Sequence, residues 1–137
     1  MSNLDALYKR RESHYEGMVY LKGNIAGLED KISRLQEASS ALETTISNQK
    51  DIQSTIDGLE VDESKWKGEE KDTFVEQYDS YVEKLEEFIS KTEDQKDIID
   101  EEIERAETSL ATSEAHLSNM ESLLDSLNDK ISEAEKG

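Results

Sequence analysis

The side chains that could hold a metal or transfer a proton are two histidines and one crowded run of carboxylates. In the segment EDQKDIIDEEIERAE, Asp97, Glu101 and Glu104 recur along one helical face. Calcium prefers several oxygen ligands that converge from a looped backbone, whereas a straight helix splays its carboxylates apart. We therefore interpret this run as a solvated helix face, and we expect no metal site and no cofactor.

The histidines occur as Glu12-Ser13-His14 and Glu114-Ala115-His116. This spacing is not the Glu-x-x-His pair of a di-iron helical bundle. If the chain folds back near residue 64 or 65, the two histidines come to similar heights and could make that end of the molecule pH-sensitive. The alternative is that both are partly exposed packing residues beside an apolar seam, and the sequence leaves both interpretations open.

Catalytic arrangements are not readable in the sequence, and the charge restricts the partners. The chain has no cysteine nucleophile, no glycine-rich phosphate loop and no Ser-His-Asp pattern, so we expect no enzyme. The formal net charge of −18 over 137 residues opposes binding to nucleic acid and to anionic membranes. It favours a basic or apolar protein partner.

The N-terminal residues lack the apolar stretch of a secretory signal, and no apolar run is long enough to span a bilayer. We therefore expect no signal peptide and no membrane insertion.

Long helices must position whatever this chain does, because proline is absent and glycine is scarce. Steps of three and four residues predict one heptad seam in each half. The first seam comprises Leu4, Leu7, Arg11, His14, Met18, Leu21, Ile25, Leu28, Ile32, Leu35, Ser39, Leu42, Ile46, Gln49, Gln53 and Ile56. The second comprises Phe74, Tyr78, Tyr81, Leu85, Phe88, Thr92, Gln95, Ile99, Ile103, Ala106, Leu110, Ser113, Leu117, Met120, Leu124, Leu127, Ile131 and Ala134. Two successive four-residue steps, from Gln95 through Ile99 to Ile103, predict a stutter that locally unwinds a supercoil.

Between the two seams, Gly58, Asp62, Ser64 and Gly68 gather where the apolar rhythm lapses. The sequence thus predicts an all-α fold, a long antiparallel two-helix hairpin resembling a coiled coil. Its helices span roughly 3–58 and 69–135 and its turn spans 59–68, all in a single domain over 1–137. A pair of such helices buries only one narrow stripe each, so we expect partner helices to complete the fold.

The start of the second helix carries the densest aromatic surface in the chain. Valines and an isoleucine run beside the aromatic rings at sevenfold spacing and widen the stripe, as suits a bundle of three or four helices. We predict a partner-binding face there, and the alternative is that these residues form the core of the hairpin. The predicted face comprises Val75, Tyr78, Tyr81, Val82, Leu85, Phe88 and Ile89.

The turn holds the only tryptophan, in the spacing W-x-G-x(5)-F formed by Trp66, Gly68 and Phe74. Trp66 either caps the last apolar layer of the hairpin or caps it and also contacts a partner. The pattern, set between two long amphipathic helices, resembles the Trp-x-Gly (WXG) superfamily of helical-hairpin proteins handled by type VII secretion systems of Gram-positive bacteria. The length of the chain is more similar to the YwqH-like group encoded beside LXG-type toxins.

That resemblance implies a targeting factor that binds the N-terminal helical domain of an LXG-type toxin, alone or with a second small helical protein. It implies a cytoplasmic location before export and leaves open whether the protein is itself secreted. The Tyr-x-x-x-Asp/Glu export signal expected after the second helix is missing, because no aromatic residue follows Phe88. Tyr8 and Glu12 match its spacing at the wrong end, so the signal belongs to a partner on this reading. The alternative is a homodimeric coiled-coil scaffold or adaptor unrelated to secretion.

Overall fold

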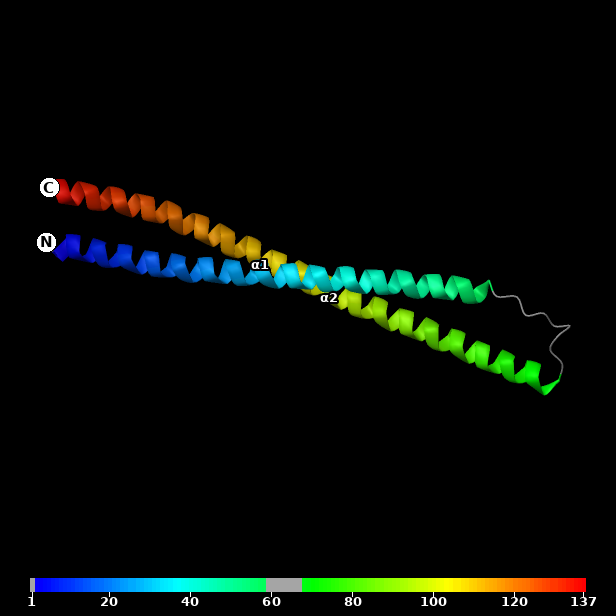
Figure 1. Cartoon of the computed structure of the whole chain (residues 1–137). Coiled ribbons are helices and arrows are strands. Elements are labelled where there is room, and N and C mark those ends of the chain that lie inside the picture. The colour runs from blue at the N-terminus through cyan, green and yellow to red at the C-terminus, as the bar shows by residue number, and fades with distance from the viewer. Residues whose placement is uncertain (1, 59–67) are drawn as a thin grey trace. The chain divides into compact units, whose positions relative to one another are not determined.

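The chain is an all-α helical hairpin, as the sequence predicts. The computed structural model describes residues 2–58 and 68–137, and no strand occurs in these two ranges. Helix α1 spans Ser2–Asp57 and helix α2 spans Glu69–Lys136 (Figure 1). Both helices begin and end within a residue of the predicted bounds. Within the described ranges, no helix is long and apolar enough to cross a membrane.

The helix ends beside the turn are set by glycines. Gly58 donates its backbone N–H to the carbonyl of Ser54 at 3.0 Å and closes α1. Gly68 has a φ of +67°, a conformation that side chains with a Cβ adopt at a cost, and its carbonyl accepts from the N–H of Asp72 at 3.3 Å. The carboxylates of Glu70 and Asp72 then lie at the positive end of the α2 dipole, where negative charge is stabilised.

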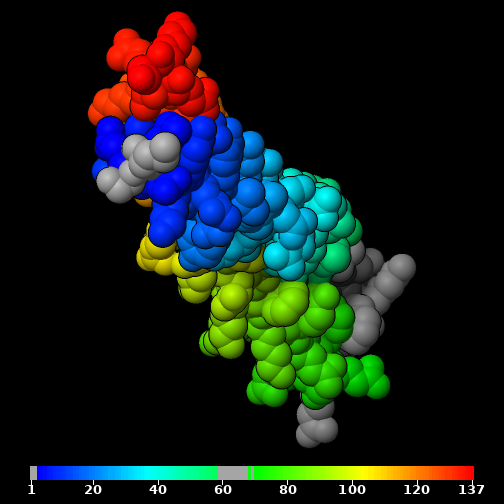
Figure 2. All heavy atoms as spheres, turned by 90° about the vertical axis from the view of Figure 1, so that its left-hand side faces the viewer, coloured from blue at the N-terminus to red at the C-terminus, as the bar shows by residue number. Residues whose placement is uncertain are grey.

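The helices pair in two compact units, and each unit combines a segment of α1 with a segment of α2. Unit 1 comprises Met1–Arg34 and Ile103–Gly137, and its buried cluster is Leu7, Leu127 and Ile131. The Tyr8 hydroxyl donates to Glu135 at 2.5 Å, and so the first turns of α1 lie against the last turns of α2 (blue and red in Figure 2).

Unit 2 comprises Leu35–Glu102. Three contacts connect its two helical segments in antiparallel order. Ser39 donates to Asp100 at 2.6 Å, Lys50 lies 3.5 Å from Glu93, and the Tyr78 hydroxyl donates to the carbonyl of Ile56 at 2.7 Å. In each unit, when a residue of α1 faces a residue of α2, their two residue numbers add up to about 140 in most pairs.

The seam predicted for α1 is confirmed, because each of its residues from Leu4 to Ile56 is buried or half-buried. We label the heptad positions a to g, with a and d in the seam. Positions a of α1 then run from Leu4 to Gln53 and positions d from Leu7 to Ile56.

The seam predicted for α2 is confirmed from Ile99 to Ala134, and before it only at Tyr78, Leu85 and Thr92. Tyr81, Phe88 and Gln95 are exposed, and their neighbours Val82, Ile89 and Lys96 face α1 instead. Positions a of α2 are Val75, Val82, Ile89, Lys96, Ile103, Leu110, Leu117, Leu124 and Ile131. Positions d are Lys71, Tyr78, Leu85, Thr92, Ile99, Ala106, Ser113, Met120, Leu127 and Ala134.

This heptad runs through α2 without interruption, so the stutter predicted near Ile99 is absent. The physical reason lies at Lys96, whose aliphatic stem occupies an a position while its ammonium reaches Asp100 at 2.8 Å. A lysine therefore takes the seam position that the apolar pattern alone does not reveal.

Candidate interaction surface

The turn motif is only partly within the described residues. Trp66 lies outside them, so its role in capping or contact stays a prediction. Gly68 has the positive φ given above, and Phe74 is half-buried and stacks on Tyr78 with ring centroids 6.1 Å apart. Phe74 thus packs at the start of α2.

The predicted partner-binding face divides into an inward and an outward set. Ile89 is only 6% exposed, and Val82 and Leu85 are half-buried in the seam against α1. Tyr81 and Phe88 are instead 51% and 55% exposed. The inward residues therefore belong to the core of the hairpin, which was the alternative interpretation, and the outward ones remain available for a partner.

Two residues of the predicted face, Tyr78 and Val75, have intermediate positions. Tyr78 is half-buried, and its hydroxyl bonds the Ile56 carbonyl, one of the last carbonyls of α1 that have no partner within the helix. Val75 occupies an a position yet is 40% exposed. Val75 is exposed because Tyr78, three residues after it, already faces Ile56, and α1 ends at Asp57. Tyr78 is therefore a structural tie between the helices.

The outward aromatic residues form one row. Phe74, Tyr81 and Phe88 are seven residues apart, all at position g of α2. Ile52, which is 47% exposed, stands at position g of α1, and its number and that of Phe88 add up to the 140 typical of facing residues. We call Ile52, Phe74, Tyr81 and Phe88 the aromatic flank. A groove of about 300 Å³ opens beside it, lined by Ile56, Phe74, Gln77, Tyr78 and Tyr81.

The opposite flank of the seam is acidic. Contacts between e positions, such as Lys50 with Glu93 and Tyr8 with Glu135, place both e rows on one side of the helix pair and the g rows on the other. The e row of α2 contains nine carboxylates, and only Asn128 departs from the pattern. The nine are Asp72, Asp79, Glu86, Glu93, Asp100, Glu107, Glu114, Glu121 and Glu135.

Hydrogen bonds along the acidic flank shift three titrations. Bonds from Lys96 and from Ser39 hold the pKa of the Asp100 carboxyl below its usual value, and the same bond to Asp100 raises the pKa of Lys96. The bond to Glu135 raises the pKa of the Tyr8 hydroxyl, because a neighbouring carboxylate disfavours the phenolate. These shifts arise from the Lys96–Asp100 pair within α2 and from the contacts of Ser39 with Asp100 and of Tyr8 with Glu135 between the helices, and they supply no acid or base in a pocket.

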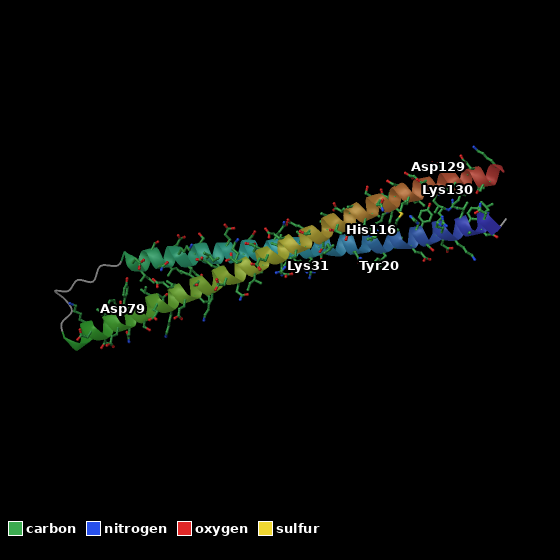
Figure 3. All side chains as sticks on the ribbon, turned by 180° about the vertical axis from the view of Figure 1, so that it is seen from behind. Tyr20, Lys31, Asp79, His116, Asp129 and Lys130 are labelled. Atoms are coloured by element: carbon green, nitrogen blue, oxygen red, sulfur yellow. The ribbon has the colours of Figure 1, made fainter. Side chains whose placement is uncertain are left out.

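Charge is divided between the sides of the helices in a way that the net charge conceals. Over residues 3–57 and 70–136, positions b, e and f hold 27 of the 30 acidic side chains, whereas c and g hold only Glu70, Glu102 and Glu133. Positions c and g also hold seven basic side chains. These are Arg10, Lys31, Arg34, Lys84, Lys91, Arg105 and Lys130. We call the c and g rows together the g side, and in Figure 3 the labels Tyr20, Lys31, His116 and Lys130 mark it in unit 1.

The histidines do not lie at similar heights. Facing residues in unit 1 have numbers that add up to about 140, so His14 faces the neighbourhood of residue 126, ten residues or about 15 Å along α2 from His116. The assumption that facing residues are symmetric about residue 64 or 65 is therefore wrong, since the facing numbers centre near residue 70. His14 is a seam residue whose Nε2 is buried without a hydrogen-bond partner, and His116 is exposed on the g side.

The carboxylate run from Glu93 to Glu107 is spread over several heptad positions, with Asp97 and Glu104 at b and Glu101 at f. Among residues 2–58 and 68–137, no group of three or more His, Asp or Glu side chains is arranged to hold a metal ion.

Comparison with known proteins gives one family. The family model described as YwqH-like matches residues 10–129, which cover most of both helices. No curated protein matches the chain, and no solved structure does.

Proposed function

The chain belongs to the YwqH-like family, and from this membership we propose that it is a noncatalytic protein of type VII secretion that binds the N-terminal helical domain of an LXG-type toxin. In this role it helps to target the toxin for export and acts in the cytoplasm before that step. The single observation that carries the proposal is the aromatic flank, a row of rings at sevenfold spacing that the hairpin leaves half-exposed. A row at this spacing matches the contact stripe of another helix.

The thin seam of the hairpin supports a need for a partner. No described side chain reaches full burial, and the most buried apolar residue is Ile131 at 2% exposure. Polar residues occupy buried seam positions at Ser39, Gln49 and Thr92, where they replace apolar contacts. Because two helices bury one stripe each, a third helix on the aromatic flank would add apolar burial that the pair alone does not achieve.

Co-purification tests the proposal. The chain would be expressed together with the N-terminal helical domain of an LXG-type toxin encoded beside it, with a tag on the toxin. We expect a complex of defined stoichiometry with the wild type and a weaker one with Trp66→Ala. If no LXG-type toxin is encoded there, or if the wild type does not co-purify, the toxin-binding function fails.

A self-assembling scaffold is the second candidate, because a second copy of the chain could also cover the row of Phe74, Tyr81 and Phe88. Sedimentation equilibrium separates the two. A tight dimer that excludes the toxin domain supports the scaffold, whereas a weakly associating chain that is further ordered by the toxin domain supports the targeting factor.

A further inference from the structure

We propose that the helix bound by this protein lies along the g side of unit 2, and that it carries carboxylates rather than basic residues beside its apolar stripe. The inference rests on the proposed function and specifies the chemistry of the partner. It departs from the expectation from net charge, which favours a basic or apolar partner.

The apolar part of the docking surface is the aromatic flank. Tyr81, Phe88 and Ile52 are each about half-exposed, and they stand on the same side of the seam in unit 2. The groove of about 300 Å³ between Ile56 and Tyr81 offers a recess for one apolar side chain of the partner. Aromatic side chains that bury one face against their own scaffold are typical anchors of helix-in-groove recognition.

Tyr81 and Phe88 are each followed three residues later by a lysine. Lys84 stands at position c beside Tyr81, and Lys91 stands at position c beside Phe88, so rings and ammonium groups form parallel rows with a repeat of seven. Neither lysine forms an ion pair with any residue that the structure describes. A helix seated on the rings would place its own flanking residues next to these two ammonium groups.

Carboxylates of the chain are absent from the c and g rows beside the exposed rings. From Phe74 to Ile98, positions c and g of α2 hold no acidic residue, and positions c and g of α1 hold none at all. Glu87 lies one helical turn from both lysines and Asp94 one turn from Lys91, both at the adjoining position f, but neither lysine pairs with them, and the e row lies on the far side of α2. The local lysines therefore decide which flanking charges fit, and the total charge of −18 does not.

A second copy of the chain fits this surface poorly. In a symmetric contact, each copy would present the same patch, so Lys84 and Lys91 would meet lysines. The partner is therefore a different helix, whose Asp or Glu side chains complement the two lysines.

Charge reversal with a matched control tests the sign of this complementarity. The test variant is Lys84→Glu with Lys91→Glu, and the control is Lys9→Glu with Lys22→Glu, which changes the net charge equally on the b, e and f rows. The affinity of each for the N-terminal helical domain of the LXG-type toxin encoded beside this chain would be measured by isothermal titration calorimetry. We expect binding to weaken about tenfold in the test variant and less than threefold in the control. Tighter binding of the test variant would indicate a basic partner and overturn the inference.

A second pair of variants tests the apolar contact. Tyr81→Ala with Phe88→Ala should weaken binding at least tenfold, whereas Tyr15→Ala with Val19→Ala, exposed residues of the e and b rows, should leave it unchanged. Circular dichroism establishes that each variant keeps its helices. If the wild type binds the toxin domain and neither test pair changes the affinity, the assigned docking surface is refuted while the proposed function stands. If the wild type does not bind the toxin domain, both fall. If the aromatic variant instead dissociates a dimer of this chain, a second copy occupies the surface and the inference is overturned.

Discussion

Glycines on the outer surface of α1 offer a quantitative test of the hairpin. At Gly23 and Gly27, an added Cβ would meet no atom within 4 Å, and both residues have ordinary helical conformations. Glycine costs about 1 kcal/mol relative to alanine in a helix interior, so Gly23→Ala with Gly27→Ala should stabilise the chain by about 2 kcal/mol. At roughly 4 °C per kcal/mol for a chain of this size, the melting temperature should rise by about 8 °C.

Two further glycines serve as controls, because the change in stability on substitution by alanine should be smaller at one and of opposite sign at the other. At Gly17, an added Cβ would lie 2.8 Å from the Met120 Cε, so the flexible methionine must move and the gain should be smaller. At Gly68 the φ of +67° penalises alanine by about 1 kcal/mol, and Gly68→Ala should lower the melting temperature. Thermal unfolding of purified variants, followed by circular dichroism at low concentration, measures all four substitutions.

A fall in melting temperature for Gly23→Ala with Gly27→Ala would refute this reasoning. It would mean that these positions are not open, for example because a second copy packs against Gly27, which lies on the g side of unit 1. Repeating the measurement at several protein concentrations would then expose the self-association, since the stability of a dimer depends on concentration.

Three more predictions follow from the packing and the hydrogen bonds. Ile131→Ala should destabilise the chain by about 2 kcal/mol, near the low end for a buried isoleucine because the seam is thin. Phe88→Ala should change the free energy of unfolding by less than about 0.5 kcal/mol, because its ring is half-exposed. Urea denaturation measures both. Tyr78→Phe should cost about 1 kcal/mol, because it leaves a carbonyl at the end of α1 without its donor, and the same denaturation series tests it. Asp100 has a pKa below its ordinary value of 3.8, so the stability that its carboxylate contributes is present above pH 3.8 and is lost as the pH falls towards the folded pKa. The difference in melting temperature between wild type and Asp100→Asn should therefore shrink at acidic pH. Lys96→Met should abolish most of this pH dependence, because it removes the ammonium that bonds Asp100. A difference that stays constant from pH 6 to pH 2 would contradict the assigned pairing of Asp100.

The helices and the seam of α1 could be predicted from the sequence because apolar residues there recur at most seam positions. Ser39 interrupts the pattern at one position, and Arg11 with His14 and Gln49 with Gln53 interrupt it at two, but apolar residues on either side of each interruption fix the register. The second half of α2 was predictable for the same reason. Long helices with a sustained heptad leave few alternatives, since a shift by one residue would expose every apolar side chain.

The start of α2 was not predictable in this way, because it has two overlapping apolar rows. Tyr81 and Phe88 compete with Val82 and Ile89 for the seam, and counting apolar residues favours the larger rings. The structure selects the β-branched row and continues it through Lys96, a choice that depends on the pairing of Lys96 with Asp100 across one helical turn. Neither the exposed aromatic row nor the charge division can be assigned until this register is known.

The residues that face each other across the hairpin were also misjudged for a physical reason. A midpoint at residue 64 or 65 assumes that the helices end at matching heights, but α1 has 56 residues and α2 has 68. Facing pairs such as Ser39 with Asp100 show that the first turns of α2 continue past the end of α1. The height of a given side chain therefore depends on where the longer helix begins to find a partner.

The charge division suggests how such a polar hairpin could select one orientation of its partner. With 27 carboxylates on positions b, e and f, a partner helix that carries its own carboxylates is repelled from every side of the chain except the g side. The same repulsion opposes lateral association of two copies through their acidic rows. Attraction on the g side then need only be modest, because the acidic rows repel such a partner elsewhere on the chain. In this scheme the acidic composition does not recruit the partner; it excludes the wrong orientations, and a partner with basic flanks would lose that selectivity.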